Sequence, residues 1–160
     1  MSSLLLTARR FELPRNLAEG CYLALRERGN DGDELFIALT AALDDEGVVR
    51  IKRGLVPEQY CHHTPEGLLV TIHGEALFAL NRDCYEHKEM LVGQIHAHPG
   101  EAYHSGADDL LALVRLPGAL SIVVPDFARG PLHPKRWSVH QRDADGGWGP
   151  LPDEIELDLS

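Results

Sequence analysis

Cysteine is scarce in this chain: among 160 residues there are three, Cys21, Cys61 and Cys84. Their number is odd, their spacing is wide, and no C-x-x-C pair occurs. Neither a disulfide framework nor a cysteine-based zinc site is therefore indicated. Because free thiols persist in reducing compartments, we expect a cytoplasmic protein.

Long apolar runs and dense basic clusters are also lacking. No apolar stretch approaches the roughly 20 residues of a membrane-spanning helix. The arginines near the N-terminus follow a short apolar stretch, which is not the order of a secretory signal. The formal net charge is −10, and no basic cluster is longer than Arg50-Ile-Lys-Arg53. We therefore expect neither nucleic acid nor a membrane as the main partner.

The chain length fits one domain with a sizeable core and is too short for two domains of ordinary size. We assign residues 1–149 to this domain and residues 150–160 to an acidic tail. In the tail, Ile155, Leu157 and Leu159 alternate with acidic residues. This alternation permits two outcomes, an added edge strand or a loose end.

Apolar periodicity predicts the secondary structure of the domain. Helical spacing predicts helices at residues 14–28, from Gly74 onward, and at 106–116. Apolar runs predict strands at residues 3–11, 33–43, 48–51, 68–72, 90–96, 119–124 and 137–141, with the first and the last at sheet edges. An acidic turn separates 33–43 from 48–51, so we expect these two strands to form a hairpin. Residues 52–67 have no clean period and are expected to form a loop.

One short segment carries the strongest chemical signal. An apolar strand ends at Pro99-Gly100, and because side chains alternate along a strand, His96 and His98 point to the same face. Ser105 and Asp108 follow at the start of the predicted helix, which brings a carboxylate beside the two imidazoles. Two nitrogens and one carboxylate oxygen form the ligand set of a catalytic zinc site, in which the fourth position stays open for water.

Each half of this motif also has a simpler explanation. Ser105-x-x-Asp108 before an apolar helix is a capping box. Two alternating histidines are more often surface or core residues than metal ligands. The occurrence of all the parts in order within one stretch favours the metal site. Asp109 stays open as an alternative to Asp108, because both residues fall in the first turn of the predicted helix.

The motif His96-x-His98-Pro99, followed after five residues by Ser105-x-x-Asp108, resembles the signature of the JAMM (MPN+, JAB-like) metallopeptidases, with a shorter spacer than is usual. The resemblance implies a single α+β or α/β domain that is JAB/MPN-like and similar to cytidine deaminase. Its mixed β-sheet would be flanked by about three helices. The resemblance also implies one Zn²⁺ per chain, held by His96, His98 and Asp108.

Glu34 is the expected proton shuttle. In this family a glutamate at the start of the strand after the first helix has that role, in a context similar to E-x-x-G-x-L-x-G. Glu34 and Leu39 match this pattern, whereas Ile37 and Ala41 stand in place of its glycines. The structural alternative for Glu34 is an exposed acid at a strand end. The competing upstream carboxylates are Glu12, Glu19, Glu27 and Glu46. The family's serine implies that Ser105 stabilises the oxyanion of a tetrahedral intermediate.

The same resemblance implies a metallo-isopeptidase that cleaves after the C-terminal glycine of a bacterial ubiquitin-like protein, in processing or deconjugation. Small members of this kind resemble proteases of antiviral operons, which also encode E1-like and E2-like enzymes. Two other interpretations stay open. One is a zinc peptidase that trims a sulfur-carrier protein or an unrelated peptide, and the other is a non-catalytic binding module on the same fold.

The run Cys61-His62-His63 offers further potential metal ligands. Adjacent histidines seldom face one ion on regular structure, and no spaced partner pair is evident nearby. We therefore expect this run to belong to a substrate-facing loop and not to a second metal site.

Overall fold

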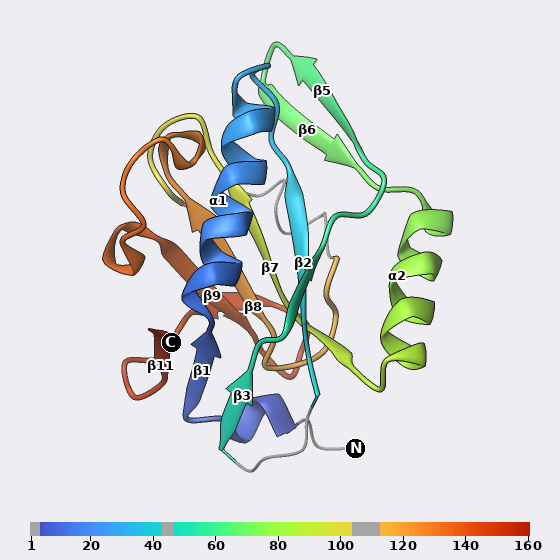
Figure 1. Ribbon diagram of the computed structural model, residues 1–160, viewed down its shortest axis with the longest axis vertical. Coiled ribbons are helices and arrows are strands. Elements are labelled where there is room, and N and C mark those ends of the chain that lie inside the picture. The colour runs from blue at the N-terminus through green and yellow to red at the C-terminus, as the bar shows by residue number, and fades with distance from the viewer. Residues whose placement is uncertain (1–3, 43–46, 104–112) are drawn as a thin grey trace.

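The computed structural model describes residues 4–42, 47–103 and 113–160. In these residues a central six-stranded sheet, two smaller sheets and two α-helices form an α+β domain (Figure 1). The central sheet has the order β10 (Trp148–Pro150), β9 (Ser138–Arg142), β8 (Leu120–Val124), β7 (Met90–Ala97), β2 (Phe36–Ala41) and β4 (Arg53–Leu55). Within it β7 and β8 are parallel and the other neighbours are antiparallel, so the predicted mixed sheet is confirmed.

Two smaller sheets complete the described structure. A parallel sheet has the order β11 (Glu156–Leu159), β1 (Arg10–Leu13) and β3 (Val48–Arg50). An antiparallel hairpin of β5 (Tyr60–Thr64) and β6 (Gly67–Thr71) lies at the top of the molecule in Figure 1. The helices are α1 (Arg15–Gly29), α2 (Gly74–Glu86) and three short 3₁₀ helices, η1 (Leu4–Thr7), η2 (Asp126–Ala128) and η3 (Pro134–Arg136). None of the helices described has the length and hydrophobicity to span a bilayer.

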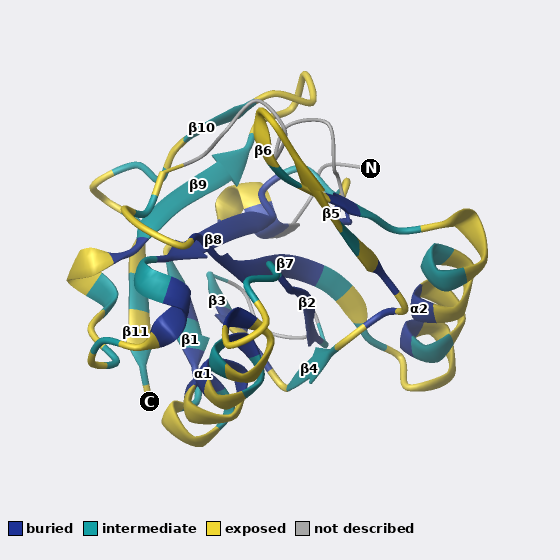
Figure 2. Cartoon of the chain, turned by 90° about the horizontal axis from the view of Figure 1, so that it is seen from above, coloured by how far each residue is buried: buried dark blue, intermediate teal, exposed yellow. Residues whose placement is uncertain are grey.

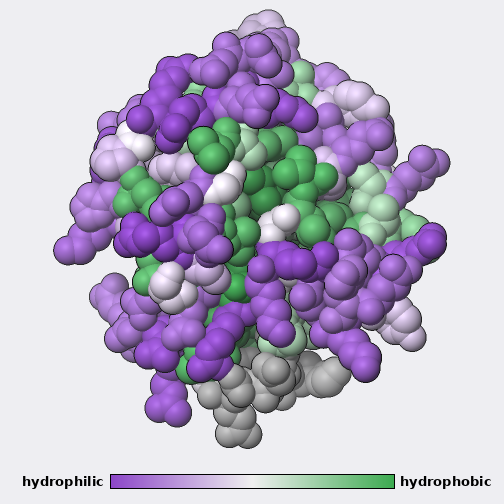
Figure 3. Space-filling view, in the orientation of Figure 1, coloured by the Kyte–Doolittle hydropathy of each residue, from purple (hydrophilic) through white to green (hydrophobic). Residues whose placement is uncertain are grey.

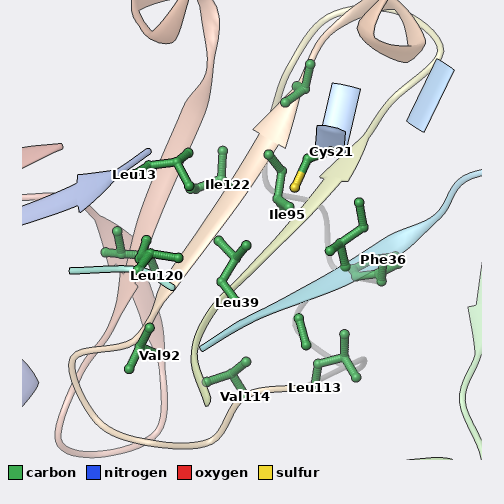
Figure 4. Close-up of a cluster of buried hydrophobic side chains, with 14 of the residues drawn as sticks. Leu13, Cys21, Phe36, Leu39, Val92, Ile95, Leu113, Val114, Leu120 and Ile122 are labelled. Atoms are coloured by element: carbon green, nitrogen blue, oxygen red, sulfur yellow. The ribbon is translucent and has the colours of Figure 1, made fainter. Parts of the chain in front are cut away.

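The centre of the large sheet is buried on both faces. Every residue of β2 and β8 is buried, and β7 is buried from Val92 to its end. Figure 2 shows α1 against one face of the sheet. Leu39, Ile95 and Ile122, from the neighbouring strands β2, β7 and β8, belong to one apolar cluster (Figure 4). Burial on both faces explains why these strands are mostly apolar and do not alternate, although they also bury the polar residues Thr40, Gln94, His96 and Ser121.

Eight predicted elements are confirmed in place: α1, α2, β2, β3, β6, β7, β8 and β9. The third predicted helix, 106–116, falls largely outside the described residues, and its described end, 113–116, is not helical. Leu113 and Val114 are instead buried in the apolar cluster (Figure 4). Their apolar spacing therefore reflects burial in the core and not a helix face.

The predicted hairpin of 33–43 with 48–51 is wrong. β2 pairs antiparallel with β4, and β3 pairs parallel with β1 in the other sheet. Gly54 of β4 helps to explain this choice. A Cβ at this position would lie 3.2 Å from Ile37 Cγ2 and 3.5 Å from Cys21 Sγ, so glycine allows β4 to pack closely between β2 and α1.

The predicted loop at 52–67 is also wrong, because it contains β4 and most of the β5–β6 hairpin. β4 is too short to show a period, and β5 is largely exposed. The strands expected at sheet edges are displaced as well. η1 occupies much of 3–11, β1 lies between β11 and β3, and β10 covers β9. The tail residues Glu156–Leu159 form β11 beside β1, which is the edge-strand outcome of the two permitted by the sequence.

Candidate metal centre

The end of β7 places two histidines in the interior. His96 is fully buried and His98 is 4% exposed. The backbone N–H of His98 donates to the Val124 carbonyl at 2.9 Å, and the His98 carbonyl accepts from the Phe127 N–H at 2.8 Å. These bonds continue the ladder between β7 and β8 past the end of β7. His96 and His98 therefore keep the alternation of the strand, and their side chains lie on the same face. Their Nε2 atoms are 3.2 Å apart.

Phe36 and Tyr103 hold the imidazole rings from two sides. Phe36 lies opposite His96 in the pairing of β2 with β7, and the two rings stack with 4.0 Å between centroids. Tyr103 meets the ring of His98 edge-on at 4.5 Å. Neither aromatic residue was singled out from the sequence. The sequence signal for Phe36 is its position, as an aromatic residue at the start of the strand that follows Glu34.

Glu34 approaches the histidines from the segment before β2. Its carboxylate and the two imidazoles each offer a ligand atom, and these three atoms lie within 4.8 Å of one another. The residue as a whole is partly buried. The structure thus brings Glu34, His96 and His98 together, although 62 positions separate Glu34 from His96 in the sequence. Their roles as general base and metal ligands stay predictions.

Gln59 fixes the backbone beside Glu34. Its amide oxygen accepts a hydrogen bond from the Phe36 N–H at 2.8 Å, and its Nε2 donates to the Phe36 carbonyl at 2.9 Å and to the Pro57 carbonyl at 3.0 Å. This buried side chain acts as a strand partner for Phe36 and so sets the path of the chain immediately after Glu34. Sequence reasoning missed Gln59, because a single glutamine in an aperiodic stretch carries no local signal.

The donor set fits a divalent metal of borderline softness. Zinc binds imidazole nitrogen at about 2.0–2.1 Å in a tetrahedral arrangement, which separates neighbouring donors by about 3.3 Å. The 3.2 Å between the two Nε2 atoms matches that separation. A nearby carboxylate completes a combination of nitrogen and oxygen donors typical of zinc peptidases.

The remaining predicted site residues, Ser105 and Asp108, lie outside the described residues, as does the alternative ligand Asp109. The structure therefore tests neither the third metal ligand nor the oxyanion donor. Tyr103 is the last described residue before this segment, and its ring contact with His98 places the chain beside the site at that point.

Two comparisons with known proteins give matches, one to a curated protein and one to a solved structure. No protein-family model matches the chain. The chain is 34% identical over 143 residues to a protein of Sinorhizobium fredii (strain NBRC 101917 / NGR234) named probable metalloprotease y4jG, and the match covers 89% of this chain and 88% of that protein. The solution structure of a protein from Salinibacter ruber (strain DSM 13855) is similar with a TM-score of 0.58, covering 92% of this chain and 90% of that chain at 16% identity. Similarity at so low an identity concerns the fold alone.

Proposed function

Because this chain belongs to the metalloprotease family of its Sinorhizobium fredii relative, we propose that it is a zinc-dependent isopeptidase of the JAMM type. The observation that carries the proposal is the position of the Glu34 carboxylate, which lies within 4.8 Å of the imidazole nitrogens of His96 and His98 at the end of β7. In sequence these residues belong to the two motifs that resemble the JAMM signature. In space they form one cluster, as a single metal-dependent site requires.

His96 and His98 would hold the metal through Nε2, with Asp108 as the proposed third ligand. When bound, zinc supplies Lewis-acid chemistry, which acidifies water near neutral pH and polarises a carbonyl group. Both imidazoles are buried, so a metal held by them would lie inside the protein at the end of β7. The stacking of Phe36 on His96 and the contact of Tyr103 with His98 restrict ring rotation, so the two nitrogens keep their mutual position.

Glu34 is proposed as the general acid and base. Its carboxylate would take a proton from the attacking water and return it to the leaving amine of the substrate. Gln59 supports this role by fixing the backbone two residues downstream, where it bonds to both the N–H and the carbonyl of Phe36. Ser105 is proposed to donate its hydroxyl hydrogen to the developing oxyanion. The reaction is hydrolysis of an amide or isopeptide bond.

The proposed substrate is a ubiquitin-like protein or one of its conjugates, with E1-like and E2-like enzymes as functional partners in the cytoplasm. The β5–β6 hairpin supports this proposal. It is a sheet of two strands that pair only with each other among the described residues. An extended tail can add a strand to such an edge, and C-terminal glycines suit a close approach of the backbone to the buried histidines.

The test uses a ubiquitin-like protein with a Gly-Gly tail, fused to a reporter, and a matched fusion in which the tail is Ala-Ala. We expect cleavage after the second glycine, loss of activity with a chelator, recovery with zinc, and much slower cleavage of the Ala-Ala fusion. Equal zinc-dependent cleavage of both fusions, or of unrelated peptides, would support a general zinc peptidase instead. Absence of hydrolysis with zinc bound would contradict the proposal and favour a binding module.

A further inference from the structure

A second group of potential metal ligands lies next to the first. Cys61 and His63 alternate along β5 and therefore share one face of the hairpin. Asp33, the residue before Glu34, meets them from the turn that follows α1. One ligand atom from each of the three residues lies within 4.8 Å of the other two. The expectation that Cys61-His62-His63 holds no metal overlooked this alternation and the distant third partner.

The turn after α1 aims Asp33 at the hairpin. The Asp33 N–H donates to the Arg28 carbonyl at 3.1 Å, and Gly32 takes a positive φ of 76° that favours glycine. The Asp33 carboxylate then reaches His63, with 2.6 Å between Oδ1 and Nε2. The two residues of this pair are 30 positions apart in sequence, and their contact joins the start of the Glu34 segment to the hairpin.

The three donors suit zinc. Thiolate, imidazole and carboxylate are all established zinc ligands, and three protein ligands leave a fourth position for water. Neighbouring nitrogen and oxygen donors of a tetrahedral zinc ion lie about 3.3 Å apart. The 2.6 Å pair of Asp33 and His63 must therefore open slightly, which is feasible because the His63 side chain is 58% exposed. Figure 3 shows that the end of the molecule that carries the hairpin is mostly hydrophilic.

The thiol of Cys61 is not an activated nucleophile. Partial burial raises the pKa of its thiol, an effect opposed by a hydrogen bond from the Glu34 backbone and reinforced by the charge of Asp33. A thiol of this kind is mostly protonated and poorly reactive at neutral pH. A zinc ion displaces the proton of a thiol that coordinates it, so the raised pKa of Cys61 does not prevent metal binding.

We propose that Asp33, Cys61 and His63 form a second zinc site that ties the β5–β6 hairpin to the segment leading into Glu34. This inference rests on its own ligands and does not depend on the proposed peptidase activity. Its physical effect would be to restrain the hairpin beside the candidate metal centre, because all three ligands come from the two segments that it joins.

Cobalt(II) is the probe, because thiolate ligation adds a near-ultraviolet charge-transfer band that nitrogen and oxygen ligands do not produce. The proposed centre at His96 and His98 has no sulfur ligand, and Cys21 and Cys84 are buried, so the band reports on Cys61 alone. The full-length chain, stripped of metal, is titrated with Co²⁺. We expect the band in the wild type, its loss in Cys61→Ser, and its retention in His98→Ala.

A matched pair of histidine variants separates ligation from surface effects. His63→Gln should weaken Co²⁺ binding by about tenfold or more, because loss even of an outer-shell partner has that effect. His62→Gln should keep the wild-type affinity, because His62 faces away and contacts Thr71 Oγ1 at 3.0 Å. Zinc content should fall by about one ion per chain in Cys61→Ser.

Absence of the thiolate band in the folded wild-type protein, or its persistence in Cys61→Ser, would overturn the second site. Equal effects of His63→Gln and His62→Gln would also overturn it. If Cys61→Ser fails to fold, His63→Gln and Asp33→Asn carry the same test, since each removes one ligand without removing the thiol. Failure of the peptidase assay would leave these spectral results unaffected.

Discussion

The two ligand clusters begin at adjacent residues, Glu34 and Asp33, but the structure holds them in different ways. His96 and His98 lie in the interior at the end of a central strand, where Phe36 stacks on one ring and Tyr103 contacts the other edge-on. Cys61 and His63 lie on an exposed two-stranded hairpin, and the contact of His63 with Asp33 links that hairpin to the turn after α1. The first cluster is organised by the core, whereas the second depends on two surface segments that meet.

This difference has a physical consequence. Donors built into a buried sheet are preorganised by the packing around them. Binding of a metal there therefore does not have to order the side chains first. Donors on a hairpin retain side-chain freedom, which binding must remove. The buried cluster suits chemistry that needs fixed distances, and the exposed cluster suits a role in restraining a surface hairpin. Measurements of activity, stability and thiol reactivity test this distinction.

The largest effect is expected at Glu34. Glu34→Gln should lower kcat by about 10²–10⁴-fold, because the variant lacks the proton-transfer group, while its zinc content stays at the wild-type value. Asp33→Asn, one residue away, should lower kcat by less than about tenfold, because its carboxylate contacts the hairpin and no reacting group. The control is Glu27→Gln on the exposed face of α1, which should match the wild type. Equal losses at positions 33 and 34 would contradict the division into two clusters.

The histidines of the two clusters should differ in their effect on stability. His96→Ala removes a fully buried ring that stacks on Phe36, and we expect it to lower the free energy of unfolding by about 2–4 kcal/mol, as for other buried large-to-small changes. His63→Ala removes an exposed hydrogen bond with Asp33, worth about 1 kcal/mol. Urea unfolding of the metal-free proteins measures both. A larger loss in His63→Ala would show that the hairpin, and not the sheet, organises the fold.

Glu89 is a largely buried carboxylate that contacts β2 and β4 at the other end of the central sheet. The Glu89 carboxylate accepts hydrogen bonds from Arg53 Nε at 2.8 Å and from Thr40 Oγ1 at 3.0 Å, and Arg53 also contacts Asp83 at 2.9 Å. Arg53→Met leaves Glu89 largely buried without its cation, so we expect a loss of about 1–3 kcal/mol at neutral pH. Thermal unfolding measures this loss, and the surface variant Arg82→Met is the control.

The effect of Arg53 should also depend on pH. The Arg53 guanidinium holds the pKa of the Asp83 carboxyl below its ordinary value. A group with a lowered folded-state pKa contributes stability above its ordinary value and loses that contribution as the pH falls through the lowered one. The difference between wild type and Arg53→Met should therefore shrink in acid. A difference that grows in acid would mean that the pair with Asp83 does not stabilise the fold.

The smallest effect concerns thiol reactivity. Burial raises the pKa of Cys21 to about 11, and its side chain is almost inaccessible, so alkylation should not reach it in the folded protein. Cys61 is partly exposed and should be the first thiol alkylated. Zinc should slow that reaction several-fold if Cys61 binds metal. Mass spectrometry of alkylated peptides measures the rates, with Cys61→Ser as the control, and unchanged labelling in zinc would count against the second site.

The local parts of the candidate site were predictable from the sequence. The strand of residues 90–96 was recognised from its apolar run, and its period of two predicted that His96 and His98 share a face, as they do. Glu34 was selected only through its resemblance to a family pattern, and the structure brings it to the histidines. Ser105 and Asp108 lie outside the described residues, so their roles remain predictions.

The pairing of distant segments was not predictable in the same way. The apolar runs at 33–43 and 48–51 were recognised as strands, but their proximity in sequence wrongly suggested a hairpin, and β2 pairs with β4 instead. The contacts of Gln59 with Phe36 and of Asp33 with His63 each join segments more than 20 positions apart. No short window contains both partners of such a contact.

The sequence by itself determined the elements with a clear apolar period, such as α1 and β7, and which face of β7 carries the histidines. These features depend on backbone periods that adjacent residues set. Only the tertiary structure decided which strands became neighbours, which carboxylate approached the imidazoles, and that Asp33 met Cys61 and His63. Those outcomes depend on burial and close packing among residues far apart in the chain, where the entropy of loop closure is offset only when the whole core forms.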